Sequence, residues 1–433
     1  MSELSAQLAA DLPDNTGVRP EWLKKIRESG AEQFRIHGLP TRKSEAWKYT
    51  SLVRLDKTGL KLASGSELPV SESEQPSPLV ESAIQLNLLD GRLVAHNGNM
   101  PAGLTIMSLK DALDNGVHGL QDLLESLSDK HIKGAPGHGL SALNSATLES
   151  GVVIHVATGT DAGSLSLLWS NSQDGKSHFV NSRICVILEQ GAKLELLEQF
   201  EGTGGNSNTS NIIMQAELGK GAGLQHVRFQ QEKEETVLIT RTEVSQQADS
   251  EYKYFGFDLG GGLVRHDLHT TLLGSGAKSG INGAYLLDGN RHVDNHTRVD
   301  HKAPGVFSEQ YFRGVAGGSG RAVFNTAVCV HPGADETEAR QSNANILLSA
   351  RAEIDTKPEL EIYADEVIAS HGATVGQLDE LAVFYLRTRG LPEHEARQLL
   401  TTAFCQSVSD KLTDPVLRGV ISQRMMDVMP QAE

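Results

Sequence analysis

Two neighbouring runs in the middle of the chain, RICVILEQ (Arg183–Gln190) and KLELLEQF (Lys193–Phe200), alternate apolar and polar side chains. Short runs with period-two alternation of apolar and polar side chains predict β-strands with one buried face. Similar runs continue from about residue 150 to residue 375, and helical patterns are nearly absent there. This succession of strand-like runs argues against alternating strand–helix units and favours an all-β domain.

Small-residue turns separate these runs at intervals that resemble a repeat. They begin at Gly191 (GAK), Gly221 (GAG), Gly276 (GAK), Ser319 (SGRA), Ser349 (SARAE) and His371 (HGA). Several of them follow one another at 22 to 30 residues, the order of length of one coil of a β-solenoid. We therefore predict a mostly β, solenoid-like core, with a jelly roll or cupin barrel as the competing all-β architecture.

Helical patterns flank this core on both sides. Near the N-terminus, Pro20 suits a first helical turn, Trp22, Ile26 and Phe34 recur near helical spacing, and Gly38 ends the segment. We expect an N-terminal helical region at 1–60, a linker and mixed segment at 61–140, the β core at 141–376 and a C-terminal helical region at 377–433. The Ser-, Glu- and Pro-rich part of the second segment is typical of an exposed loop.

The C-terminal helices have two competing interpretations. A solenoid needs its end coils covered, so the helices after Gly376 could act as a cap. Their apolar stripes could equally dock a partner protein. The sequence leaves both open.

Composition excludes several classes of function. The formal charge of −16 disfavours nucleic acid and anionic membrane as partners. No apolar run is long enough to span a bilayer, and the N-terminus lacks the pattern of a secretory signal, so we expect a cytoplasmic protein. The sequence contains no phosphate-binding loop, and its three cysteines (Cys185, Cys329, Cys405) are too few and too dispersed for a disulfide framework.

The densest polar cluster is RHVDNHTRVDHKAP, which contains His292, Asp294, His296, Asp300 and His301. On a strand the first three would share one face, while Asp300 is expected past a turn. Three roles compete for this cluster: a structural or interface role, a divalent metal site, and a carboxylate pair for glycoside chemistry. His371, in ASHGATVGQLDE, stands alone at the end of the strand-rich part, where a histidine is usually structural.

Three motifs resemble the SufB/SufD family of iron–sulfur cluster assembly scaffold proteins. They are SEAWKYTSL (Ser44–Leu52), HVDNHTRVDHKAPGVFSEQYFRGV (His292–Val315) and KPELEIYADEVIASHGATVGQLDELAVFYLRTRGL (Lys357–Leu391). The first motif and SHGATVG are similar to the SufD branch. SufB-like chains place a cysteine near Ser342 and a glutamate after the histidine, where Gly372 stands here, so the SufB branch is the alternative.

The resemblance implies a right-handed parallel β-helix flanked by helical parts, which would serve as a scaffold without catalytic activity of its own. It implies pairing with SufB through β-helix edges, and binding of the ATPase SufC through the C-terminal helices. We expect no stably bound cofactor on the isolated chain, a transient iron–sulfur cluster at the SufB interface, and reduced flavin only in the full complex. Whether the chain forms a homodimer without SufB stays open.

The resemblance also assigns candidate residues. His371 matches the family's imidazole at the cluster assembly or iron-entry site, where it would share metal with a SufB thiolate. Ala369 stands where some relatives carry a cysteine, so that thiol is not required here. His292, Asp294, His296, Asp300 and His301 are candidates for the SufB interface or for structure. The SufC-docking candidates are Leu381, Phe384, Tyr385, Leu399 and Phe404.

Two rival functions remain at this point. One is a β-solenoid carbohydrate-active enzyme that uses Asp294 and Asp300 as its carboxylate pair. The other is a cupin-like metal enzyme that uses the histidine cluster.

Overall fold

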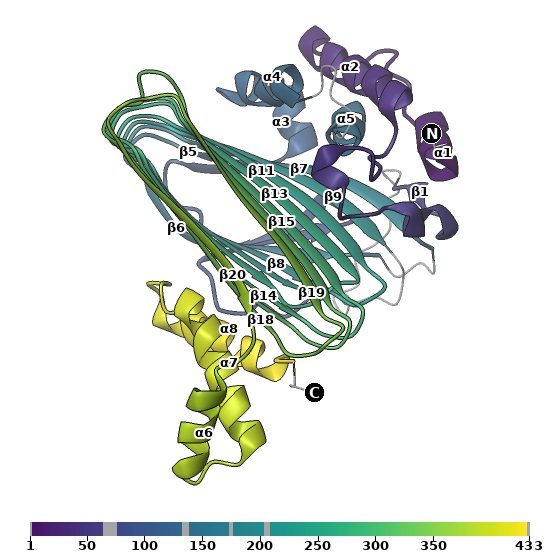
Figure 1. Ribbon diagram of the computed structural model, residues 1–433. Helices are drawn as coiled ribbons and strands as arrows, with labels where there is room; N and C mark the ends of the chain where they lie inside the picture. Colours follow the sequence, from purple (N-terminus) through teal and green to yellow (C-terminus); the bar gives the residue numbers. More distant parts are fainter. Residues whose placement is uncertain (1, 64–75, 132–137, 173–175, 203–207, 431–433) are drawn as a thin grey trace.

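The chain folds into a β-solenoid with helices on its outside, as a computed structural model shows (Figure 1). The structure describes residues 2–63, 76–131, 138–172, 176–202 and 208–430. Most of the expected linker loop lies outside the described residues. The prediction of a mostly β solenoid with helical flanks is confirmed. The jelly-roll and cupin alternatives are wrong, because the strands of the repeat pair in parallel.

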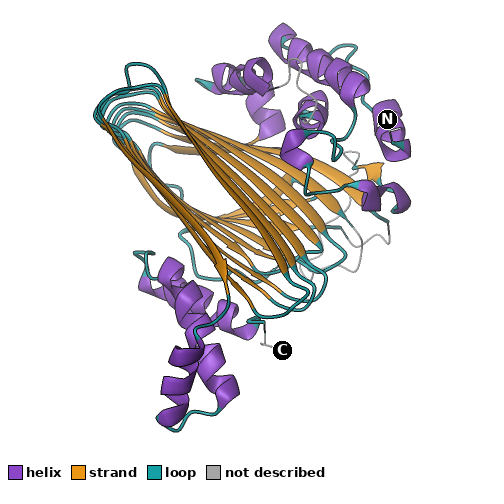
Figure 2. Ribbon diagram, viewed as in Figure 1, coloured by secondary structure: helices purple, strands orange, loops and turns teal. Residues whose placement is uncertain are grey.

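Two sheets face each other across the interior (Figure 2). Sheet A runs in the order β19 (Glu353–Ile362), β17 (Arg321–Val330), β15 (His292–His301), β13 (Leu263–Leu272), β11 (Val237–Gln246), β9 (Thr209–Leu218), β7 (His178–Leu188), β5 (Gly151–Val156) and β4 (Leu104–Ser108), with β1 (Lys61–Leu62) beside β7. Sheet B runs in the order β20 (Val367–Gly376), β18 (Thr337–Leu347), β16 (Phe307–Ala316), β14 (Lys278–Leu287), β12 (Glu251–Asp258), β10 (Gly223–Gln231), β8 (Lys193–Glu201), β6 (Asp161–Ser170), β2 (Ile84–Leu89) and β3 (Arg92–Gly98).

Each coil of the solenoid contributes one strand to each sheet. Neighbouring strands of sheet A from β7 to β19 are offset by 26 to 32 residues, the extremes being the pairs Arg241–Asp267 and Asn325–Lys357. Residues one coil apart in sequence therefore lie side by side in space.

The inward-facing side chains of the two sheets form one continuous apolar core. Large rings fill it where glycine makes room. A Cβ atom on Gly283 would overlap the Phe312 ring, and one on Gly314 would overlap the Tyr285 ring. Because protein interiors are close-packed, these glycines are part of the packing pattern.

The N-terminal helices lie on the outer face of sheet A (Figure 1). They are α1 (Glu3–Ala10), α2 (Glu21–His37), α3 (Leu109–Asn115), α4 (Leu120–His131) and α5 (Gly139–Ala146), with short 3₁₀ turns at Glu45–Trp47 and Val53–Lys57. Helix α2 follows Pro20 and ends at Gly38, whose φ of 63° favours glycine, as the sequence predicted. Among the described residues, no helix has both the length and the apolar character needed to cross a membrane.

The C-terminal helices lie on the outer face of sheet B. They are α6 (Glu380–Thr388), α7 (Glu393–Ser409) and α8 (Pro415–Asp427). Helix α7 packs on β14 and β16, and its Cys405 and Val408 are buried with apolar residues of sheet B. Of the two interpretations that the sequence left open, capping of an end coil does not fit, because the apolar surface that these helices cover is the outer face of sheet B.

The two ends of the solenoid differ. At the first end, β3 and β4 pair antiparallel to β2 and β5 and close the repeat with strands that belong to no coil. At the last end, β19 and β20 each pair on one side, with β17 and β18, and no described strand pairs with their other edge. Most side chains of β20 are exposed.

Candidate functional site

His371 lies in the middle of β20, at the bare end of the solenoid. It stands opposite Gln341 of β18, which is buried, and Val367 and Ala369 of the same alternate row pack against the inner core. His371 therefore belongs to the inward-facing row, yet its side chain is exposed because the next coil is missing. An imidazole in this position faces whatever covers the last coil.

The row beneath His371 is polar. Gln341 Nε2 donates to Thr326 Oγ1 at 3.1 Å, and Thr326 Oγ1 donates to Gln310 Oε1 at 2.7 Å. Thr297 Oγ1 also donates to Gln310 Oε1. These side chains form a hydrogen-bonded ladder in the interior near the bare end, and His371 stands opposite its last member, Gln341.

Apolar side chains surround this bare end. Ile362, Tyr363, Ile368 and Val375 are 40%, 61%, 69% and 42% exposed. Exposed apolar residues beside open strand edges are typical of a protein–protein contact rather than of a solvated edge, which natural proteins protect with charge.

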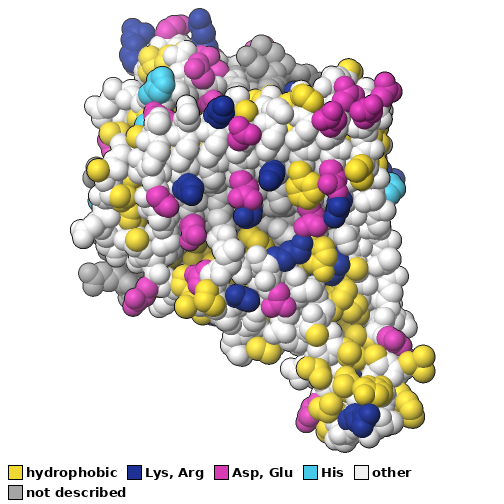
Figure 3. All heavy atoms as spheres, turned by 90° about the vertical axis from the view of Figure 1, so that its left-hand side faces the viewer, with side chains coloured by type: hydrophobic (Ala, Val, Ile, Leu, Met, Phe, Trp, Pro, Cys, Tyr) yellow, Lys and Arg dark blue, Asp and Glu magenta, His cyan; other side chains and the backbone are white. Residues whose placement is uncertain are grey.

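A second exposed apolar patch lies on the C-terminal helices. Four of the five predicted docking residues, Leu381, Phe384, Tyr385 and Leu399, are 49% to 78% exposed. Figure 3 shows hydrophobic side chains gathered on the protruding lower part of the molecule, where α6 lies in Figure 1. The fifth, Phe404, is half-buried against sheet B, with its ring 5.8 Å from the Arg313 guanidinium.

The predicted polar cluster does not converge on one point. His292, Asp294 and His296 share the outer face of sheet A, as expected. The expectation that Asp300 sits past a turn is wrong, because β15 continues to His301 and keeps Asp300 on that same outer face. His301 points inward, where Nε2 is 2.8 Å from Ser308 Oγ.

The first half of the cluster holds the N-terminal region in place. Asp294 is 1% exposed and bonds Arg265, His296 and Thr50, and the Arg265 guanidinium lies 4.0 Å from the centre of the Trp47 ring. His292 Nε2 is 2.9 Å from Thr50 Oγ1. The SEAWKYT motif is therefore docked on the HVDNH motif, a contact between segments far apart in the chain that no sequence pattern predicted.

Electrostatics around these residues fit a structural role. Burial would raise the pKa of Asp294, but Arg265 and His296 hold it well below its usual range. Burial would also raise the pKa of Asp300, but hydrogen bonds from His269 and Arg298 lower it. Burial lowers the pKa of His292 to about 4. Glycoside hydrolysis requires one carboxyl group with a raised pKa, so this pair does not suit it.

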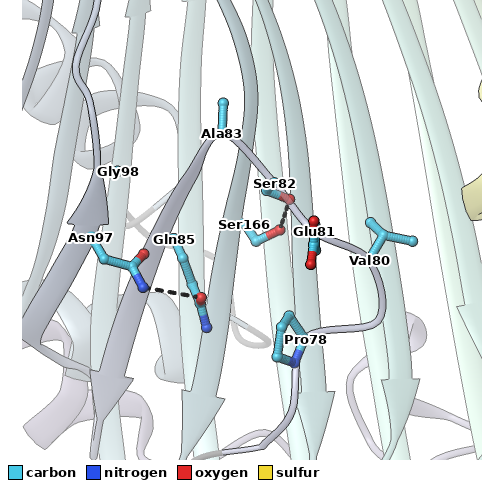
Figure 4. A pocket seen from close by; sticks show the side chains of 9 residues that line it. All are labelled: Pro78, Val80, Glu81, Ser82, Ala83, Gln85, Asn97, Gly98 and Ser166. Atoms are coloured by element: carbon cyan, nitrogen blue, oxygen red, sulfur yellow. Dashed lines mark hydrogen bonds between the residues drawn. The ribbon is translucent and has the colours of Figure 1, made fainter.

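A cavity of about 340 Å³ lies at the first end of the solenoid (Figure 4). Its lining includes Ser82 and Ser166, whose hydroxyl groups are 2.5 Å apart, and Asn97, which donates to Gln85. Glu81 is the only ionisable residue among its described lining, so the cavity offers no acid–base pair. All three cysteines are buried free thiols.

Comparisons with known proteins cover nearly the whole chain. Residues 169–404 match the family described as "SUF system FeS cluster assembly, SufBD core domain", and residues 16–164 match "SufBD protein N-terminal region". The iron–sulfur cluster assembly protein SufD of Escherichia coli is 27% identical, over 97% of this chain and 99% of its own. An iron–sulfur cluster assembly SufBD family protein of Synechocystis is 28% identical, over 94% and 91%.

SufD of Bacillus subtilis is 24% identical, over 91% of each chain. These similarities to SufD agree with the SufD-like motifs, and the SufB alternative is not favoured. The chain belongs to the SufBD family of iron–sulfur cluster assembly proteins, as a SufD-like member.

Proposed function

We propose that this chain is a non-catalytic scaffold subunit of a SUF complex with SufB and SufC, on which an iron–sulfur cluster is assembled for transfer to apo-proteins. The observation that carries the proposal is the bare last coil. It presents His371 between open strand edges in a chain that is SufD-like over nearly its full length.

Pairing with SufB would use the bare end of the solenoid. The outer edges of β19 and β20 offer backbone N–H and C=O groups to an added strand, a common mode of protein recognition. Ile362, Tyr363, Ile368 and Val375 supply apolar area for the contact. A second copy of this chain could use the same end when SufB is absent, which would give the homodimer.

The cluster would be built where the two subunits meet. Iron–sulfur clusters are usually held by several thiolates, and none of the three cysteines lies on β19 or β20 at the bare end. The thiolate must then come from SufB, while His371 supplies a nitrogen ligand or guides iron entry. The isolated chain should hold no cluster, and reduced flavin remains a prediction for the assembled complex.

SufC would dock on the apolar patch of α6 and α7. Leu381, Phe384, Tyr385 and Leu399 are exposed there, whereas α7 and α8 are held against sheet B. SufC would hydrolyse the ATP, since this sequence has no phosphate-binding loop. The isolated chain should show no ATPase activity, and we expect it in the cytoplasm with its partners.

The test is co-purification of tagged chain with SufB and SufC from native lysate, using two reciprocal variants. Ile368→Asp should lose SufB and retain SufC, because it places a charge on the bare end. Phe384→Asp should lose SufC and retain SufB. In each variant, binding of the retained partner shows that the variant is folded.

A deletion after Gly376 is a poorer test of SufC docking, because it would uncover the apolar outer face of sheet B. Recovery of neither partner with the unmodified chain would overturn the proposal. Loss of both partners in a variant that remains folded would show that the two surfaces are not separate.

A further inference from the structure

A cluster of metal-ligating side chains lies on the outer face of sheet A. It consists of Asp300 on β15 and of Cys329 and His331 on and just after β17. One ligand atom of each lies within 4.8 Å of the others. We infer that these three residues bind a divalent transition-metal ion, a site separate from the proposed cluster-assembly site at His371.

The solenoid repeat brings the three residues together. Asp300 is directly opposite Cys329 in the register of β15 and β17. His331 lies two residues after Cys329, just past the end of β17, so its side chain is on the same face, and its backbone N–H donates to His301 O at 2.9 Å, which anchors it beside the same coil. Two adjacent coils thus supply the ligands, and strand pairing fixes their spacing.

The distances suit a small ion. Bonds of about 2.0–2.3 Å in tetrahedral geometry hold ligand atoms about 3.3–3.8 Å apart. The ligand atoms lie within 4.8 Å of one another, and His331 Nε2 is 3.2 Å from Asp300 Oδ1, so ion binding requires the widest pair to close by about 1 Å. Cys329 and Asp300 are buried, and the side chain of His331 is 35% exposed, so an ion can enter from the histidine side.

The carboxylate of Asp300 is oriented from behind. His269 Nε2 lies 2.6 Å from Asp300 Oδ2, and His269 Nδ1 lies 2.9 Å from Glu243 Oε2. Such a chain of outer partners is the arrangement that orients ligands in metal sites. His331 Nε2 lies 3.2 Å from Asp300 Oδ1, so a metal ion would take the place of the proton between them.

The chemistry of the three ligands selects the class of metal. A thiolate, an imidazole and a carboxylate together suit Zn²⁺, Co²⁺ or Fe²⁺, whereas Mg²⁺ and Ca²⁺ prefer oxygen ligands alone. The Cys329 thiol would release its proton to solvent on binding. Glu361, opposite Cys329 on β19, is in position to be a fourth ligand. Arg298, which also bonds Asp300, has a side chain that is 42% exposed and can swing away.

The test uses Co²⁺ as the probe on the full chain without SufB or SufC. We expect one Co²⁺ per chain, with near-ultraviolet charge-transfer absorption from thiolate to cobalt and displacement by Zn²⁺. Cys329→Ser should remove this absorption. His331→Gln changes a partly exposed side chain, so the fold should be retained, and it should weaken Co²⁺ binding by at least about tenfold.

Two matched controls accompany these variants. His155→Gln alters another histidine–carboxylate pair, with Glu189, on sheet A. Cys405→Ala removes a buried thiol under the C-terminal helices. Both should bind Co²⁺ as the unmodified chain does. The inference is overturned if the unmodified chain takes up no Co²⁺, or if the thiolate absorption survives in Cys329→Ser.

Discussion

At the scale of single residues, His371 is an exposed imidazole in a row of otherwise inward-facing side chains. We expect His371→Ala to leave the fold and the complex intact, because truncating an exposed side chain seldom alters stability. The iron and acid-labile sulfide content of the complex with SufB and SufC should fall by more than about tenfold. Loss of a residue that only supports a metal ligand typically costs about tenfold.

The controls for this variant are His292→Ala and His296→Ala. Both residues lie at the docking contact with the N-terminal region, so their loss should lower stability and leave cluster content per folded complex unchanged. Normal cluster content in His371→Ala would remove His371 from cluster chemistry. Its loss solely through failure to bind SufB would make His371 an interface residue.

Asp294 on β15 and Arg265 on β13 form a buried ion pair on the outer face of sheet A, and both contact the N-terminal region that docks there. Asp294→Asn should lower the free energy of unfolding by about 3 kcal/mol, because it leaves a buried guanidinium with a weakened partner. Asp267→Asn is the matched control. It removes the more exposed partner of Arg265 and should cost about 1 kcal/mol or less. Urea unfolding measures both losses of free energy. Equal losses in the two variants would contradict the expectation that Asp294 contributes more to stability than Asp267.

His266 should make the fold sensitive to acid. Burial, with Arg228 and His226 nearby, lowers its pKa well below 6.5. As pH falls below about 6.5, His266 is protonated in the unfolded chain but stays neutral in the folded chain. The free energy of unfolding therefore decreases as pH falls. A histidine that stays neutral in the fold costs about 2 kcal/mol between pH 7 and pH 5.

Urea midpoints measured at pH 7 and pH 5 check this expectation. His266→Gln should reduce the difference between them, while His96→Gln, at an exposed position, should leave it unchanged. An undiminished difference in His266→Gln would assign the acid sensitivity to other groups.

At the scale of elements, ring-over-glycine packing ties successive coils together. Gly314→Ala should destabilise the fold by about 1–3 kcal/mol, because the new methyl group would overlap the Tyr285 ring. Gly280→Ala is the matched control on the neighbouring strand, since the nearest atom to its Cβ would be 3.9 Å away. A urea midpoint of Gly314→Ala equal to that of the control would show that the interior accommodates the added methyl group without loss of stability.

The elements themselves could largely be predicted from the sequence. Alternating runs such as KLELLEQF predicted strands, and Pro20 and Gly38 predicted the bounds of α2. The place of the C-terminal helices could not be predicted, because an apolar helix stripe fits a sheet face as well as an end coil.

The site was partly predictable. A histidine cluster close in sequence looked like one site, but alternation along β15 sends His301 inward and the others outward. Asp300 and Cys329 lie 29 residues apart, which is one coil, so an exact repeat length would have paired them. The contact of Trp47 with Arg265 carries no such signal.

At the scale of the whole molecule, the solenoid is asymmetric. Antiparallel strands that belong to no coil close its first end, helices cover both outer faces, and the last coil remains bare. An open sheet edge with exposed apolar side chains invites association, so natural proteins seldom keep one without a partner. The arrangement therefore fits a subunit more closely than a free-standing protein.

Hydrogen–deuterium exchange on the chain alone and in complex with SufB tests directly whether SufB adds to the bare last coil. Exchange reports which backbone amides become protected when a partner adds a strand. We expect the amides of β19 and β20 to gain the strongest protection, while those of β5 and β6 at the other end are unchanged. Complex formation that leaves β19 and β20 exchanging as in the isolated chain would contradict this expectation.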